Sequence, residues 1–374
     1  MKVIISPDSF KGTMSSVDAA ETIEKGLKQL NKQIETVCLP VADGGEGTLE
    51  ALVAATSGEF VEVTVCDPIG RIIQAKYGVL GDGNTCVIEM AQASGIMLLS
   101  EDERNPLKLT TYGTGQLIDH ALSKGYRQFI VGIGGSATND AGLGMLHALG
   151  VKFLDEALQP LPIEVSSIEK LNTIDTSEMN ELISQSHFTI ACDVDNPLVG
   201  ERGATAIFGP QKGIMPEQIK QFDQYLTHFA DIVEKEKGIS LHYYPGAGAA
   251  GGIGGAFKAY FPSTFKKGIE VVLDALQYDK HLQDAHLVIT GEGKSDIQTL
   301  AGKAPMGIAL KAKEYNIPTA LISGVIDQTA KEELQQMFAH VFSVVGDDIT
   351  SNESLENPAK CLQQRVEKAF REVF

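Results

Sequence analysis

Four short segments of this 374-residue chain carry carboxylates, and three of them combine these with lysines or glycines. They are residues 8–12 (DSFKG), 43–47 (DGGEG), 193–197 (DVDNP) and 291–296 (GEGKSD). Carboxylate oxygens are ligands that Mg²⁺ prefers, lysine neutralises charge on a phosphoryl group in transfer, and glycine-rich backbone offers N–H groups to phosphates. The combination indicates phosphoryl transfer from magnesium-bound ATP.

Each segment is expected to follow a strand of a parallel sheet, where ligands gather at the carboxyl ends of strands. A single aspartate or glycine after a strand is more often ordinary turn chemistry. Four such loops in one chain favour the functional interpretation. An acidic loop also needs a cation before it accepts ATP, which strengthens the magnesium prediction.

Two further glycine patterns point to other chemistry. Residues 132–137 (GIGGSA) follow an expected strand and fit the dinucleotide fingerprint G-x-G-x-x-A, so a nicotinamide-dependent oxidoreductase of a small hydroxy acid is the main alternative. Residues 246–251 (GAGAAG) follow a poor strand, and we expect them to pack backbone closely. A P-loop NTPase is not supported, because Val288 stands where the first Walker glycine is required.

The two ends of the chain have alternating strand and helix patterns. The first sixty residues predict strands at 3–6 and 36–41, with a helix capped by Ser15 between them and a second helix ending at Gly58. The last ninety predict strands at 286–290, 319–323 and 341–345, with helices at 305–315, 331–338 and from Pro358 onward. Neither end has enough strands for a core of its own. Together they predict a doubly wound, five-stranded parallel sheet of Rossmann or flavodoxin type.

The middle of the chain predicts a different domain. Strands at 60–66, 72–79 and 85–90 are separated by turn sequences, which favours antiparallel pairing. A helix at 115–123, a strand at 128–133 and a helix after Ala141 follow. We therefore expect two unlike α/β domains: a discontinuous one from 1–59 plus 283–374, and an inserted mixed-sheet domain from 60–282.

Composition excludes several classes of function. Forty-nine acidic against thirty-one basic residues leave a net charge of −18, which repels nucleic acid and anionic membranes. No apolar run approaches the length of a membrane span or a signal-peptide core, so we expect a cytoplasmic protein. The same observation disfavours a periplasmic-type binding protein, the non-catalytic alternative. Zinc is not indicated, because the five cysteines include no C-x-x-C pair.

Longer motifs resemble one family, the bacterial type I glycerate kinases. The resemblance rests on PDSFKG at 7–12, ADGGEGT at 42–48, GIGGSATNDAGLG at 132–144, ACDVDNPLVGERG at 191–203, FGPQKG at 208–213, PGAGAAGG at 245–252 and TGEGKSDIQTLAGKAP at 290–305. These motifs occur in order and span nearly the whole chain. The resemblance implies ATP-dependent phosphorylation of D-glycerate with Mg²⁺, the 2-phosphate being favoured over the 3-phosphate. It also implies two unlike α/β domains with a cleft between them.

We assign roles to individual residues as hypotheses from their chemistry. Asp193 is expected to orient the glycerate hydroxyl and accept its proton. Lys11 and Lys294 are expected to neutralise the transferring phosphoryl group. The remaining assignments are Asp43 and Glu46 for Mg²⁺, Gly134, Gly135, Ser136, Gly291 and Gly293 for ATP, and Asp8, Ser9, Arg202 and Asp296 for glycerate.

Overall fold

The structure is a computed structural model that describes residues 1–371 and divides the chain into two units. Unit 1 comprises Met1–Asp43, Glu50–Gly58 and the chain from Gly268 onward, and unit 2 comprises Gly44–Leu49 and Glu59–Lys267. These bounds differ from the predicted ones in two segments and, by one residue, at Glu59. Residues 268–282 join unit 1, where the Tyr278 hydroxyl and Ser6 Oγ form a buried 2.8 Å hydrogen bond. Residues 44–49 join unit 2, where the Leu49 amide donates to the Glu89 carboxylate at 2.8 Å.

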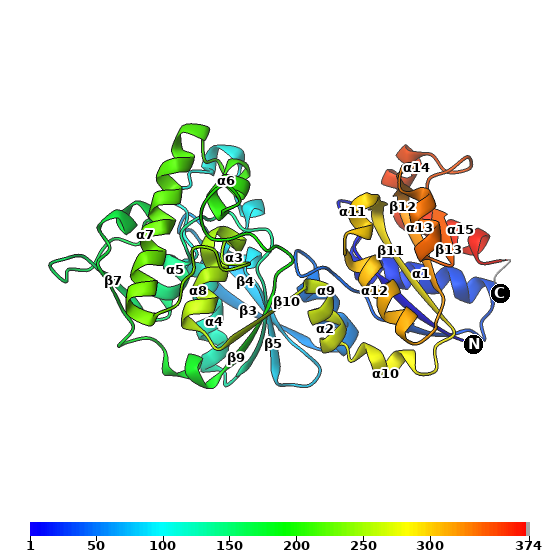
Figure 1. The fold of residues 1–374 in the computed structure, drawn as a ribbon. Helices are drawn as coiled ribbons and strands as arrows, with labels where there is room; N and C mark the ends of the chain where they lie inside the picture. Colours follow the sequence, from blue (N-terminus) through cyan, green and yellow to red (C-terminus); the bar gives the residue numbers. More distant parts are fainter. Residues whose placement is uncertain (372–374) are drawn as a thin grey trace. The chain divides into compact units, whose positions relative to one another are not determined.

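Unit 1 contains a five-stranded, entirely parallel sheet, as the sequence predicts (Figure 1). Its strands are β1 (Lys2–Pro7), β2 (Glu35–Cys38), β11 (Leu287–Ser295), β12 (Thr319–Ile326) and β13 (His340–Ser343). The order across the sheet is β13-β12-β11-β1-β2, so the chain winds outward in both directions from the boundary between β1 and β11. This is the flavodoxin-like order, and its ligand site is expected where the winding reverses.

The helices of unit 1 cover both faces of that sheet. They are α1 (Ser16–Leu30), α9 (Gly268–Ala275), α10 (Tyr278–Leu282), α11 (Ile297–Leu300), α12 (Ala304–Glu314), α13 (Lys331–Met337), α14 (Ser351–Glu356) and α15 (Pro358–Ala369), together with most of α2 (Thr48–Thr56). Alternate side chains of the strands, including Val3 and Ile5, form a core with α1 and α15. Ser15 caps α1 by accepting from the Asp18 amide at 3.1 Å, as its position predicts.

Strand β11 is longer than the sequence predicts. Residues 291–295 are predicted as a loop after a strand ending at 290, but they continue the strand because they pair in register with β12, from Gly291 opposite Ile322 to Ser295 opposite Ile326. The glycines of this segment suggested a loop, yet a strand with close neighbours on both sides also favours glycine. A Cβ on Gly291 would lie 2.0 Å from the Ile322 carbonyl oxygen.

Unit 2 is built on a six-stranded mixed sheet of order β10-β9-β6-β5-β4-β3. Its strands are β3 (Glu59–Cys66), β4 (Ile72–Val79), β5 (Thr85–Glu89), β6 (Gln128–Gly132), β9 (His187–Ala191) and β10 (Ser263–Lys266), and a separate hairpin pairs β7 (Lys152–Leu154) with β8 (Thr173–Asp175). The predicted antiparallel pairing of the first three strands is confirmed, whereas β5, β6, β9 and β10 run parallel. Their carboxyl ends therefore lie on one edge.

The helices of unit 2 pack on this mixed sheet to form the larger of the hydrophobic cores. They are α3 (Ala91–Ser94), α4 (Tyr112–Ser123), α5 (Leu143–Ala148), α6 (Ala204–Phe208), α7 (Ile219–Lys237) and α8 (Ile253–Tyr260). Phe129, Phe188 and Phe257 are fully or almost fully buried in that core, with the first two rings stacked 4.6 Å apart. Within residues 1–371, no helix combines the length and apolar character that crossing a membrane requires.

Candidate functional site

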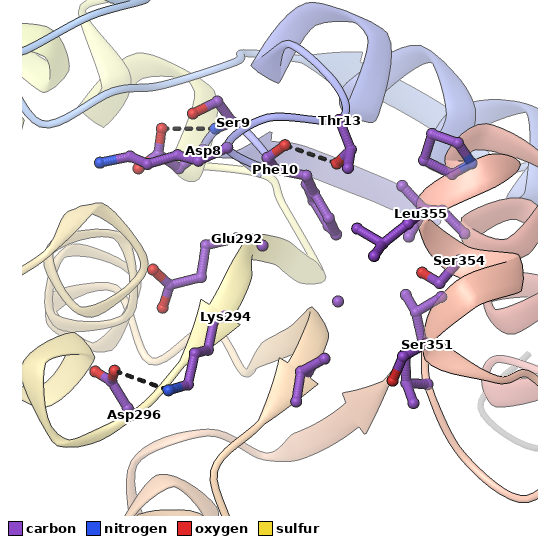
Figure 2. A pocket seen from close by; sticks show the side chains of 18 of the residues that line it. Asp8, Ser9, Phe10, Thr13, Glu292, Lys294, Asp296, Ser351, Ser354 and Leu355 are labelled. Atoms are coloured by element: carbon purple, nitrogen blue, oxygen red, sulfur yellow. Dashed lines mark hydrogen bonds and ion pairs between the residues drawn. The ribbon is translucent and has the colours of Figure 1, made fainter. Parts of the chain in front are cut away.

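A cavity of about 360 Å³ opens in unit 1 at the boundary between β1 and β11. Strand β1 leads directly into Asp8, Ser9 and Lys11, and the end of β11 supplies Glu292, Gly293 and Lys294 (Figure 2). This is where the winding of the sheet reverses, so the topology places the motifs where ligands bind in this fold. Of the residues predicted for the site, the cavity brings together Asp8, Ser9, Lys11, Asp43, Gly293, Lys294 and Asp296.

Asp8 is a buried carboxylate in this cavity. Its backbone amide donates to the Gly291 carbonyl at 2.8 Å, which extends the β1–β11 pairing past the end of β1, and its Oδ1 accepts from the Ser9 amide at 2.6 Å. Burial raises the pKa of the Asp8 carboxyl to about 7, and the negative charges of Asp43 and Glu292 add to the rise. The cavity therefore crowds carboxylates that resist ionising together.

Glu292 is a carboxylate that the sequence motif contains but to which we assigned no role. It is 5% exposed, and it accepts hydrogen bonds from Ser295 Oγ at 2.9 Å and Thr299 Oγ1 at 2.6 Å. Ser295 Oγ lies a further 2.6 Å from Ser323 Oγ on β12. Burial raises the pKa of Glu292, while the two hydroxyl donors oppose that rise. This network holds the end of β11, the start of α11 and β12 in one arrangement.

Three lysines line the polar end of the cavity. Lys294 is 60% exposed and its Nζ lies 3.9 Å from both Asp296 and Asp327, and Lys303 Nζ lies 3.9 Å from Asp296. Ion pairs of nearly 4 Å between partly exposed side chains contribute little to stability, so the ammonium groups can turn toward an anionic ligand. Lys11, also exposed, is the third. Lys303 was missed, although it lies in the motif at 290–305.

Asp296 and the glycines of β11 have structural roles that the sequence did not predict. Asp296 caps the short helix α11 by accepting from the Gln298 amide at 2.9 Å, and its own amide donates to Thr299 Oγ1 at 3.0 Å. Gly293 lines the cavity, and a Cβ there would lie 3.2 Å from the Lys11 amide nitrogen. Gly291, which we predicted to contact ATP, is instead enclosed between β1 and β12.

A second set of motif loops meets in unit 2. Glu89, Gly132, Ala191 and Lys266 stand in one row where the four parallel strands end. The loop of Gly134, Gly135 and Ser136 and the loop of Asp193 therefore leave neighbouring strands β6 and β9 on the same edge of the sheet.

The glycine loop at 44–47 packs directly against this edge. A Cβ on Gly132 would lie 2.8 Å from the Gly44 carbonyl oxygen, and one on Gly134 would lie 3.0 Å from Gly45 Cα. The close approach of two backbones, some ninety residues apart in sequence, explains why glycine stands at positions 132 and 134. The sequence predicted loops rich in glycine at these positions but not that they touch.

The loop at 132–137 does not open a helix, which corrects the prediction that Gly134, Gly135 and Ser136 lie at a helix start. Residues 133–142 are irregular, and the six-residue helix α5 begins only at Leu143. The dinucleotide fingerprint requires a helix N-terminus at its last glycine to hold the pyrophosphate. The nicotinamide alternative therefore loses the structural context on which it depends.

Lys212 anchors this loop and was missed by the sequence analysis. It ends the one-turn 3₁₀ helix η5 (Pro210–Lys212) and is only 1% exposed. Its ammonium donates to Ser136 Oγ and to the Thr138 carbonyl, both at 2.7 Å. Burial lowers the pKa of Lys212 to about 7, against the attraction of the Asp140 charge. The motif FGPQKG contained this lysine, but only the fold reveals its burial.

Among the buried polar atoms near Lys212, some have hydrogen-bond partners and others do not. The Asp140 carboxylate accepts from Thr111 Oγ1 at 2.8 Å and from three backbone amides, so it is well satisfied although burial raises its pKa. Thr138 Oγ1 and Asn139 Oδ1 are buried without a hydrogen-bond partner among the described residues. Such groups are rare in native interiors and mark a place where water or a ligand atom completes the network.

The other predicted residues of unit 2 are at its surface. Asp193 and Glu46 are exposed. Arg202 forms a 2.7 Å ion pair with Asp195, in which the two side chains are 67% and 73% exposed, and its carbonyl accepts from Asn196 Nδ2. An exposed pair of this kind contributes at most about 1 kcal/mol. The ion pair neither supports nor contradicts the prediction that Arg202 binds the glycerate carboxylate.

The acidic side chains of the cavity suit magnesium bound together with a nucleotide. Within residues 1–371, no group of three or more histidine, cysteine, aspartate or glutamate side chains is arranged to hold a metal ion. Mg²⁺ needs only one or two carboxylates when phosphate oxygens complete its shell. Asp8 and Asp43 line one cavity, and the Asp43 charge raises the pKa of Asp8, so the pair fits a divalent cation. Glu46, the predicted partner of Asp43, belongs to unit 2.

Comparison with known proteins identifies the family that the motifs resemble. Residues 3–373 match the glycerate kinase family. The chain is 44% identical to a glycerate kinase of Bacillus subtilis, over 97% of this chain and 95% of the other, and 42% identical to the glycerate 2-kinase of Escherichia coli, over 100% and 97%. A crystal structure of a proposed glycerate kinase 2 from Salmonella typhimurium superposes with a TM-score of 0.91 at 42% identity, covering 100% of this chain and 97% of that one. The chain therefore belongs to the glycerate kinase family.

Proposed function

We propose that this protein transfers the γ-phosphoryl group of ATP to the 2-hydroxyl of D-glycerate, giving 2-phosphoglycerate and ADP. The observation that carries the proposal is the cavity at the β1–β11 boundary, where three lysines and several carboxylates line one hollow in a chain of the glycerate kinase family. The Escherichia coli relative is named a glycerate 2-kinase, which supports the 2-position over the 3-position. A cytoplasmic location stays a prediction.

The lysines of the cavity and the Glu292 network would have different roles in the transfer. Lys294, Lys303 and Lys11 face the polar end, where their positive charges would offset the charge of the phosphates and of the transferring group. The Glu292 network fixes the strand that carries Lys294, so that lysine starts from a defined position. Positioning and electrostatic stabilisation are the main contributions that a protein makes to phosphoryl transfer.

Magnesium would be held by Asp8 and Asp43 together with phosphate oxygens, and it would supply further charge neutralisation at the phosphates. Burial and the neighbouring charge of Asp43 raise the pKa of Asp8, and a divalent cation between the two carboxylates would offset that charge, which supports this assignment. Asp193 as proton acceptor, Arg202 as carboxylate ligand and Glu46 as a metal ligand stay predictions, because they lie in unit 2 and not in this cavity.

An assay coupled to enolase tests both the activity and the position of transfer. The purified protein is incubated with MgATP and D-glycerate, and enolase is added without a phosphoglycerate mutase. Prompt formation of phosphoenolpyruvate is expected, because enolase acts on the 2-phosphate. ADP release without phosphoenolpyruvate would refute the 2-position, and no ADP release above that with ATP alone would refute the kinase activity. L-Glycerate serves as the stereochemical control.

A further inference from the structure

The cavity of unit 1 has two chemically different ends. One end carries the lysines and carboxylates described above. The other is apolar and is formed by Val344 and Val345 beyond β13, Leu355 of α14 and Leu362 of α15. Val325 of β12, the cross-strand neighbour of Lys294, extends this apolar lining to the edge of the polar end. Figure 2 shows Leu355, with Ser351 and Ser354 of the same helix, on the wall opposite Glu292 and Lys294. None of these residues was predicted to have a role.

Two of these apolar side chains are exposed to an unusual degree for a cavity wall. Leu355 is 63% exposed and Val325 is 40% exposed, whereas Val344 and Leu362 behind them are buried at 2% and 1%. The apolar lining therefore combines two buried side chains with two exposed ones. An apolar surface inside a concave site, bordered by polar groups, is typical of a pocket that buries part of a small ligand.

The chemistry of the two proposed substrates selects the occupant of this end. Glycerate has three carbons that carry a carboxylate and two hydroxyls, so it has almost no surface that would gain from valine and leucine. ATP has a flat purine base at one end and a polyanionic triphosphate at the other. Its two ends match the two ends of the cavity, and the volume of about 360 Å³ is within the range of small-molecule sites.

We propose that Val325, Val344 and Leu355 form the subsite for the purine base of ATP, with the triphosphate directed to Lys294 and Lys303. The hydroxyls of Ser351 and Ser354 line the same end and are available to the nitrogen atoms at the edge of the base. The inference rests on the proposed function, because it takes ATP to be the phosphoryl donor. It adds the orientation of the nucleotide, which nothing in the motifs had indicated.

The variant Leu355→Gln tests the subsite, and Leu310→Gln is its matched control. Both leucines are exposed helical residues of unit 1, at 63% and 48%, but Leu310 on α12 does not line the cavity. We expect Leu355→Gln to raise the KM for ATP at least fivefold while kcat and the KM for glycerate stay within twofold of the wild type. Leu310→Gln is expected to leave all three unchanged.

Two inhibitors test the binding of the base and the binding of the phosphates separately. Adenosine carries the base without phosphates, and tripolyphosphate carries phosphates without the base. In Leu355→Gln the inhibition constant of adenosine is expected to rise at least fivefold, while that of tripolyphosphate stays the same. An equal rise for both inhibitors, a rise in the KM for glycerate alone, or no change in any constant would overturn the proposal.

A direct measurement of adenosine binding tests the subsite independently of whether the protein is a glycerate kinase. Adenosine binding to the wild type and to Leu355→Gln is measured by isothermal titration calorimetry, with Val325→Thr as a nearly isosteric second variant. Weaker binding by both variants supports the subsite even if the enolase-coupled assay finds no phosphoglycerate. Unaltered adenosine binding by folded variants of an active kinase would refute the subsite and leave the kinase activity standing.

Discussion

Replacing Lys212 by methionine should remove a pH dependence of stability that its burial creates. The pKa of Lys212 is lowered from 10.5 to about 7 in the folded protein. Between these values the unfolded chain binds a proton at this position that the folded protein has lost, so the free energy of unfolding rises with pH. One pKa unit corresponds to about 1.4 kcal/mol, which gives a gain of about 2 kcal/mol between pH 7 and pH 9.

The measurement is equilibrium urea unfolding, followed by circular dichroism, at pH 7 and pH 9. The wild type is expected to gain about 2 kcal/mol more than Lys212→Met between the two pH values, because methionine fills a similar volume and does not titrate. Lys235→Met, on the exposed side of α7, serves as the control and should keep the wild-type slope. Parallel pH dependence in the wild type and Lys212→Met would refute the conclusion that a titrating lysine is buried there.

The same variant also tests whether the loop that Lys212 anchors takes part in catalysis. Methionine cannot donate to Ser136 Oγ or to the Thr138 carbonyl, so the loop at 134–138 loses two hydrogen bonds. If that loop contacts ATP, as the sequence predicts, kcat/KM for ATP should fall at least tenfold, with Lys212→Arg retaining part of the activity. A wild-type kcat/KM in folded Lys212→Met would show that the anchor is structural only.

Three other substitutions test the remaining assignments. Lys294→Ala should raise the KM for ATP at least tenfold in steady-state assays, because one of the cavity's positive charges is lost; unaltered kinetics would remove this lysine from the phosphate site. Asp193→Asn should lower kcat at least about 10²-fold without changing the urea midpoint. Glu201→Gln, at an exposed position nearby in sequence, serves as its control. Near-normal turnover of Asp193→Asn would exclude Asp193 as proton acceptor. Gly132→Ala should destabilise the protein by about 1–3 kcal/mol in urea unfolding, because the new Cβ would lie 2.8 Å from the Gly44 carbonyl oxygen; an unchanged midpoint would contradict that close packing.

The sequence was sufficient to predict the class of the fold and, except at β11, the strand ends that carry the motifs. Short apolar runs separated by capped helices specify the parallel sheet of unit 1, and the turns between 60 and 85 specify the antiparallel part of unit 2. Because each motif directly follows such a run, the convergence of Asp8 with Lys294 in one cavity also followed from topology.

The remaining features depend on packing that no local pattern encodes. Lys212 lies in a one-turn helix, and nothing near it in sequence indicates that Ser136 and Thr138 will surround its ammonium. The apolar end of the cavity was missed for a similar reason, because Leu355 resembles any surface leucine until its helix is placed opposite Lys294. Glycines at 291–295 gave a misleading signal, since close strand neighbours and loops both favour that residue.

The pairing of β1 with β11 has a consequence for the order in which the chain folds. Val3 lies opposite Leu287, so during synthesis on the ribosome the first strand emerges long before its central partner exists. All the strands and helices of the mixed-sheet unit are made in that interval, and they are complete before β11 leaves the exit tunnel. The nascent amino-terminal strand can pair with β2 early, but its edge toward β11 stays unpaired until translation is nearly finished. The parallel-sheet unit is consequently the last part of the protein to become native.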